Sequence, residues 1–110
     1  MKVHLIKEQT IRYYVVSHAP CRSSFDNWLT SAKYADWAIP EDIQQTFGSA
    51  DLLGDGSDRV VFNIGGNNYR MICKYFFGTT LVHLSVYWIG THAEYDELCE
   101  NGEQYTVKAY

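Results

Sequence analysis

The sequence has few cysteines, and their positions favour neither disulfide bonds nor a metal site. Its three cysteines, Cys21, Cys73 and Cys99, form no Cys-x-x-Cys pair and show no ligand spacing with the four histidines. An odd number of separated thiols does not make a disulfide framework, and zinc sites need closely grouped ligands. We therefore expect no metal or other cofactor, and a reducing environment such as the cytoplasm.

Long hydrophobic runs are also missing. The longest apolar stretch, residues 75–89, is interrupted by glycine, threonine, histidine and serine, which is typical of a strand and not of a membrane span. Residues 1–6 are too short for the apolar core of a signal peptide. These features predict a protein that does not associate with membranes.

Positive charge is scarce, since 13 acidic residues outweigh 9 basic ones and give a formal net charge of −4. This balance argues against a protein that coats nucleic acid, because phosphate binding usually needs a basic surface. The acidic residues cluster at 51–58 and 94–103, however, so a local basic patch remains possible elsewhere.

With 110 residues, 46% of them hydrophobic, the chain has the size and core of a single domain over residues 1–110.

Helices are predicted mainly in the first half of the chain. After a short strand at 3–6, apolar residues at helical spacing indicate a helix at 8–18 and a second one from Pro20 to about Trp37. Proline followed by two acidic residues predicts a short third helix at 40–47. Residues 48–58 are rich in turn formers and predict a loop.

Alternating residues and glycine-containing turns predict a meander of three strands in the second half, at Arg59–Ile64, Tyr69–Phe77 and 81–89. Thr91 and Glu94 have the spacing of a capping box, which predicts the start of a last helix. The segment 105–107 would either add an edge strand or hang loose. The fold class is therefore α+β, with the N-terminal helices packed on one face of a small antiparallel sheet and a short C-terminal helix.

Strand alternation assigns side chains to the two faces of this sheet. The first set suits the helix-covered core and consists of Val60, Phe62, Ile64, Met71, Cys73, Tyr75, Val82, Leu84, Val86 and Trp88. Trp28 and Trp37 are likewise interpreted as core or helix-docking residues. The second set consists of Asn63, Arg70, Lys74, His83 and Tyr87 on the opposite face, with His92 and Tyr95 at its rim.

Cations, histidines and tyrosines on one face suit single-stranded RNA, which proteins hold by base stacking and guanidinium contacts. Cleaving RNA without a metal needs help in deprotonating the 2′-hydroxyl, a cation for the phosphorane and an acid for the leaving oxygen. Arg70 and Lys74 are candidates for the cation. His92 has a side chain that titrates near neutrality, and Tyr95 could orient the phosphate or relay a proton.

Each of these residues also has a purely structural interpretation. Arg70 could be an ordinary surface ion-pair residue, and Lys74 could extend from a half-buried strand. His83 could be an exposed polar residue, and Tyr87 a cross-strand packing partner. His92 could merely complete the packing at a helix start, and Tyr95 could belong to the core. The pair Gly65–Gly66 joins two strands and so is not a nucleotide-binding loop.

Three stretches resemble the HigB family of type II toxin–antitoxin toxins, over about residues 35–97. They are Ala35-Asp36-Trp37 with Ile43, Phe47 and Ser49-Ala50-Asp51; Val60-Val61-Phe62-Asn63-Ile64 with Gly66-Asn67 and Tyr69-Arg70; and Gly90-Thr91-His92-Ala93-Glu94-Tyr95-Asp96. The resemblance implies a RelE-like fold and metal-free mRNA cleavage in the ribosomal A site, with the 2′-hydroxyl as nucleophile. It also implies a helix-turn-helix antitoxin of the HigA kind as partner.

The resemblance further implies the functional positions Asn63, Asn67, Arg70, His92 and Tyr95. Lys74 follows a pattern found in many relatives. The chain departs from the family in being acidic and in continuing beyond Asp96 with an acidic segment. Two functions therefore stay open: a ribosome-dependent endoribonuclease, favoured by Arg70 and His92, and a catalytically weak or inactive protein of the same fold that binds an antitoxin or RNA, favoured by the charge.

Overall fold

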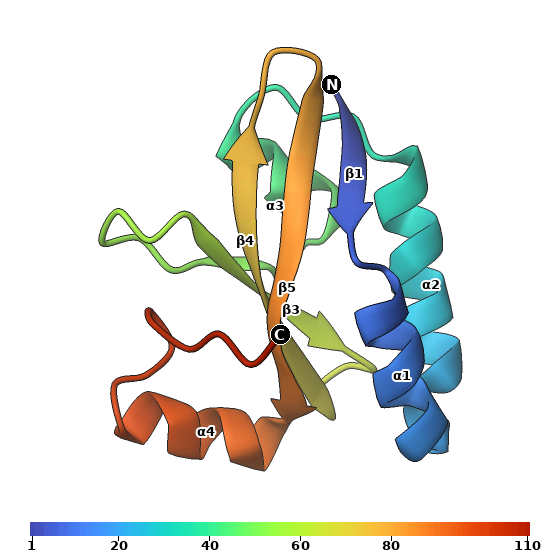
Figure 1. Cartoon of the computed structure of the whole chain (residues 1–110), viewed down its shortest axis with the longest axis vertical. Coiled ribbons are helices and arrows are strands. Elements are labelled where there is room, and N and C mark those ends of the chain that lie inside the picture. The colour runs from blue at the N-terminus through green and yellow to red at the C-terminus, as the bar shows by residue number, and fades with distance from the viewer.

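A five-stranded sheet runs through the computed structural model, which describes all residues 1–110 (Figure 1). The strand order is β1-β5-β4-β3-β2. The strands are β1 (Lys2–Ile6), β2 (Asp51–Leu52), β3 (Arg59–Ile64), β4 (Tyr69–Phe77) and β5 (Leu81–Thr91). The helices are α1 (Gln9–Ser17), α2 (Arg22–Tyr34), α3 (Ile43–Thr46) and α4 (His92–Glu100), with 3-10 turns at Ala19–Cys21 and Pro40–Asp42.

The predicted meander and the α+β fold class are confirmed. Strands β3, β4 and β5 pair antiparallel, and β3 and β4 have the predicted bounds. β5 continues two residues beyond the predicted 89. The sheet as a whole is mixed, because β1 pairs parallel with β5, with His4 opposite His83. This long-range pairing connects the first strand to the middle of the sheet.

Helices α1 and α2 cover one face of the sheet and form the main core with it (Figure 1). Ile11 of α1 and Phe25 of α2 are fully buried. Trp28 packs edge-on against Phe62 of β3, with ring centroids 5.1 Å apart. The predicted core positions of Trp28 and Trp37 are thus confirmed. No helix in the structure has the length and apolar character needed to cross a membrane.

The other face of the sheet is not open. In Figure 1 the C-terminal segment 101–110 passes in front of the strands, and α4 lies beside them at the lower left. Val61 and Ile72 point to this face by strand alternation, yet they are 3% and 0% exposed and lie outside the main core. Residues 105–107 do not add a strand, and the segment that contains them does not hang loose. The Ala109 N–H donates to the Tyr87 carbonyl at 2.7 Å, which ties this segment to β5.

A bulge in β5 overturns the core position predicted for Trp88. Cys73 pairs with Val86, but its neighbour Ile72 pairs with Trp88, so Tyr87 is an extra residue in β5. Because one extra residue reverses the alternation, Trp88 joins Ile72 on the face covered by α4, and Ile89 enters the main core. The indole of Trp88 lies beside Tyr95, with ring centroids 6.1 Å apart.

The capping box at the start of α4 is confirmed. The Glu94 N–H donates to Thr91 Oγ1 at 3.2 Å, and the Thr91 N–H donates to Glu94 Oε1 at 2.7 Å. This reciprocal pair satisfies two backbone donors that a helix start would otherwise leave free. It fixes the direction in which α4 leaves β5, and with it the positions of His92 and Tyr95.

Candidate functional site

Asn63, Arg70 and Gly90 form one row across the three strands of the meander. Asn63 pairs with Arg70, and Arg70 pairs with Gly90. Residues directly opposite each other point to the same face, so Asn63 and Arg70 lie side by side on the α4 face. Asn63 also lines a hollow of about 300 Å³ at the free edge of β3, together with Ser24 and Asn27.

The guanidinium of Arg70 is held in place by the turn that precedes its strand. Nη2 donates to Asn67 Oδ1 at 3.2 Å, and Nη1 donates to the Tyr69 carbonyl at 3.0 Å. The residue is 8% exposed, and no carboxylate forms an ion pair with it. Arg70 is thus a fixed cation whose charge is not neutralised by a partner.

His92 begins α4 next to this turn. Its backbone N–H donates to the Asn68 carbonyl at 3.0 Å, which joins the start of α4 to the β3–β4 turn. The imidazole is exposed, and its Nδ1 lies 3.4 Å from Asp96 Oδ1 on the next turn of the helix. One ring nitrogen therefore faces a carboxylate while the rest of the ring meets solvent.

Tyr95 is half-buried one turn further along α4. Burial raises the pKa of its phenol above the ordinary value, as do Cys99 and Asp51, while the charge of Arg70 acts in the opposite direction. The ring of Tyr95 lies beside Trp88, which is two residues from the Gly90 that stands opposite Arg70. The structure brings together Asn63, Asn67, Arg70, His92 and Tyr95 at one end of the α4 face.

The remaining predicted residues lie at the other end of that face. Lys74 is four residues along β4 from Arg70, or about 13 Å at about 3.3 Å per residue. His83 packs against Phe76 and edge-on against His4, with ring centroids 6.1 Å and 5.6 Å away. The covered apolar row of Val61, Ile72 and Trp88 separates this end from Arg70. Lys74, His83 and Tyr87 are thus not brought to the group around Arg70.

Arg59 is a second buried cation on this face, and the sequence analysis did not single it out. It pairs with Lys74 across the sheet and is 6% exposed. Its guanidinium carbon lies 4.9 Å from the centre of the Tyr87 ring. Burial lowers the pKa of Arg59 from its ordinary value, and Tyr87 acts in the opposite direction. Strand parity could have found this residue, because Arg59 shares a face with Asn63.

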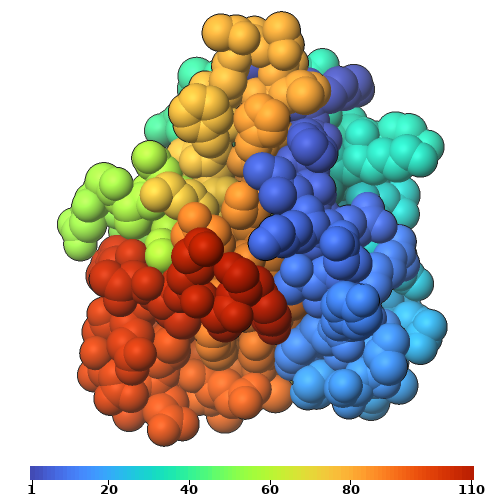
Figure 2. All heavy atoms as spheres, in the orientation of Figure 1, coloured from blue at the N-terminus to red at the C-terminus, as the bar shows by residue number.

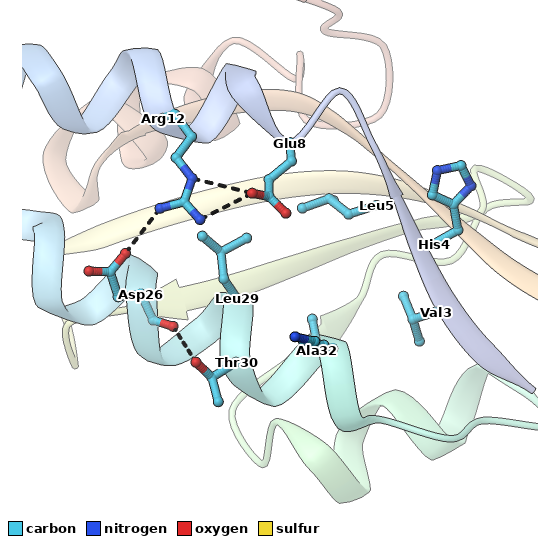
Figure 3. A pocket seen from close by; sticks show the side chains of 10 residues that line it. Val3, His4, Leu5, Glu8, Arg12, Asp26, Leu29, Thr30 and Ala32 are labelled. Atoms are coloured by element: carbon cyan, nitrogen blue, oxygen red, sulfur yellow. Dashed lines mark hydrogen bonds and ion pairs between the residues drawn. The ribbon is translucent and has the colours of Figure 1, made fainter.

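A larger groove, of about 600 Å³, lies elsewhere, between β1, α1 and α2 (Figure 3). Three of its charged groups pair with one another, since Arg12 lies 3.1 Å from Glu8 and 3.4 Å from Asp26. None of the predicted site residues lines it. No three side chains of histidine, cysteine, aspartate or glutamate come together as a set of metal ligands.

The comparison with protein families identifies the kind of protein to which this fold and site belong. A family model described as a RelE-like toxic component of a toxin–antitoxin system matches residues 21–98. The match covers more than half of the chain and includes the whole meander and most of α4. The chain therefore belongs to the HigB toxin family, as the resemblance predicted. A search of curated proteins gave no match.

Membership of this family makes the chain a toxin of a toxin–antitoxin system and implies an antitoxin as its partner. The matched region starts earlier than the resemblance suggested, at Cys21, and so includes α2. β1, α1 and the segment 101–110 lie outside it.

Proposed function

We propose that this toxin is a ribosome-dependent mRNA endonuclease that uses the 2′-hydroxyl of the RNA as nucleophile and needs no metal. The observation that carries the proposal is the setting of Arg70. Its guanidinium is fixed by Asn67, has no carboxylate partner, and lies at the end of the sheet where α4 presents His92 and Tyr95.

In the proposed reaction the 2′-oxygen attacks the adjacent phosphorus and the 5′-oxygen leaves. A P–O bond forms as another breaks, the 2′-hydroxyl loses a proton, and the leaving oxygen gains one. Arg70 stabilises the negative charge that builds on the phosphorane, and because it is already held in position it needs little reorganisation. The imidazole of His92 exchanges protons with the RNA, because a neutral ring nitrogen accepts a proton and a protonated one donates it.

Tyr95 has a different role in this proposal. Its raised pKa keeps the phenol protonated at neutral pH, so it donates a hydrogen bond or a proton and does not act as a base. Asn63 and Asn67 orient the phosphate beside Arg70. Lys74, His83 and Tyr87 bind the RNA further along the face, where the histidine and the tyrosine offer rings for stacking.

The proposed substrate, mRNA on the ribosome, implies where the toxin acts, and the family implies its partner. The toxin acts in the cytoplasm on mRNA in the ribosome, and a HigA-like helix-turn-helix antitoxin binds and silences it.

Two observations favour the alternative of a catalytically weak protein that still binds an antitoxin or RNA. One is the net charge of −4, and the other is the 8% exposure of Arg70.

Expression in bacteria separates the two functions. Wild-type protein is expected to stop growth and to produce cuts in mRNA, whereas Arg70→Ala and His92→Ala should each lower cleavage about a hundredfold, as loss of a transition-state contact does. Arg22→Ala, which removes an exposed arginine of α2, is the matched control and should stay toxic. Harmless wild-type protein that still captures a helix-turn-helix antitoxin would favour the alternative.

A further inference from the structure

We infer that Arg59, Lys74 and Tyr87 form a second binding site, which holds one nucleotide of single-stranded RNA and which the C-terminal segment 101–110 covers in the free protein. That the ligand is RNA rests on the proposed function; that the site is covered rests on the contacts of residues 101–110 with Arg59 and Tyr87. These three residues are called the Arg59 site below.

The bonding of Arg59 is incomplete for a buried cation. Its Nη1 donates to the carbonyls of Val107 and Gln104, at 2.6 Å and 3.3 Å, while Nε and Nη2 make no hydrogen bond within the protein and keep some contact with solvent. No carboxylate forms an ion pair with it. A charge withdrawn from water costs free energy unless it is paired with an opposite charge. Two neutral carbonyls therefore satisfy the guanidinium of Arg59 less well than an anion would.

The carbonyl oxygens of Val107 and Gln104 lie where the oxygens of a phosphate could bind Arg59 more strongly. A phosphate accepts two parallel hydrogen bonds from a guanidinium and carries a charge, which makes such bonds shorter and stronger than those to a neutral carbonyl. Lys74 stands directly opposite Arg59 in the β3–β4 ladder and is exposed. A phosphate at this point would therefore meet two cations.

Tyr87 completes the site with an aromatic ring. Arg59 lies over this ring at 4.9 Å and Lys108 at 5.5 Å, measured to the ring centre. Lys108 belongs to the covering segment, so its withdrawal would free one approach to the ring for a base. One phosphate on Arg59 and Lys74 with one base on Tyr87 is the pattern by which proteins hold single strands.

The covering segment is held to the sheet by few bonds. Besides the two bonds from Arg59, the Ala109 N–H donates to the Tyr87 carbonyl, while the backbone bonds of residues 101–103 run to the end of α4. No ion pair links 101–110 to the rest of the protein. In Figure 2 the atoms of this segment, in dark red, cross the middle of the face that is seen. It also lies beyond the region that the family model matches. RNA that displaces it would connect the Arg59 site to the group around Arg70.

Full-length Ala109→Pro tests the inference, because proline lacks the N–H that binds Tyr87 while the chain length is kept. The matched control, Ala109→Ser, retains the N–H. The probe is an oligoribonucleotide of about ten nucleotides with 2′-O-methyl groups, which cannot be cleaved. Ala109→Pro should bind it about fivefold more tightly than Ala109→Ser, the effect of one net hydrogen bond on the population of the open form.

Adding Arg59→Met to Ala109→Pro should remove that gain and lower the slope of log affinity against log salt by about 0.7, the loss of one phosphate contact. Arg59→Lys should keep the slope. Equal binding by Ala109→Pro and Ala109→Ser, or a gain that survives Arg59→Met, would overturn the inference.

Hydrogen exchange gives an independent readout in the wild-type protein. Amides of 101–110 should exchange faster when the oligoribonucleotide binds, and unchanged or slower exchange would contradict displacement of the segment. Neither measurement involves ribosomes or cleavage. If mRNA cleavage is absent but displacement occurs, the proposed function fails alone; if cleavage depends on Arg70 but the segment stays in place, this inference fails alone.

Discussion

The indole of Trp88 fills the space that a side chain at Gly90 would need. A β-carbon built at position 90 would lie 2.4 Å from Cη2 of Trp88, closer than any real carbon contact. Gly90 also stands opposite Arg70 in the sheet. The bulge at Tyr87 thus has a consequence for the site, because it turns Trp88 onto the face where Arg70 and Tyr95 lie.

Replacing Gly90 with alanine should therefore force Trp88 out of position. We expect Gly90→Ala to lower the free energy of unfolding by about 1–3 kcal/mol, the usual cost of overpacking, and to reduce mRNA cleavage. Urea unfolding of the purified protein measures the first effect. Gly48→Ala is the matched control, since nothing lies within 4 Å of a β-carbon there. Equal stability of the two variants would show that Trp88 does not constrain position 90.

Asn67 should act through the position of Arg70. Asn67→Ala removes the acceptor of Arg70 Nη2, and we expect cleavage to fall about tenfold, or about 1.4 kcal/mol in the barrier, while the thermal unfolding midpoint changes little. Single-turnover cleavage measures the effect. Asn68→Ala is the control, because the Asn68 side chain makes no hydrogen bond. An equal loss of cleavage in both variants would show that the effect comes from the turn and not from the position of Arg70.

Tyr14 carries a buried hydroxyl without a hydrogen-bond partner. Removing such a group relieves an unmet desolvation cost, so Tyr14→Phe should leave stability unchanged or raise it by up to about 1 kcal/mol. Chemical unfolding tests this expectation, with exposed Tyr13→Phe as the reference. A clear loss of stability in Tyr14→Phe would mean that the hydroxyl is bonded in solution.

Stability should fall in alkaline solution. Burial raises the pKa of Tyr95 and of Tyr14, so folding favours their protonated forms. Their contribution is fully present below the unfolded-state pKa of about 10 and is lost as the pH rises above it. Unfolding free energies measured across this range should decrease, and Tyr95→Phe should show a smaller decrease. Parallel curves for the two proteins would contradict the raised pKa of Tyr95.

The meander could be predicted from the sequence because each strand alternates and each turn carries its own glycines. The bulge could not, since one extra residue between Val86 and Trp88 leaves the local composition of β5 unchanged. The parallel pairing of β1 and the place of residues 101–110 depend on contacts between distant parts of the chain. Of the site, strand parity grouped Asn63 and Arg70 with His92 and Tyr95 at the rim, and the family resemblance added Asn67. The same parity also grouped Lys74, His83 and Tyr87, which lie apart from Arg70, and the analysis missed Arg59, whose burial depends on that segment.

Arg70 is proposed to support cleavage by the neighbouring 2′-oxygen, and the chemistry of the cut ends tests this role most directly. Purified toxin, ribosomes and a defined mRNA should yield fragments with a 2′,3′-cyclic phosphate and a 5′-hydroxyl. A 2′-deoxy nucleotide at the cleaved position, or Arg70→Ala, should abolish the cut. Fragments with 5′-phosphates, or equal cleavage of the 2′-deoxy substrate, would contradict the account.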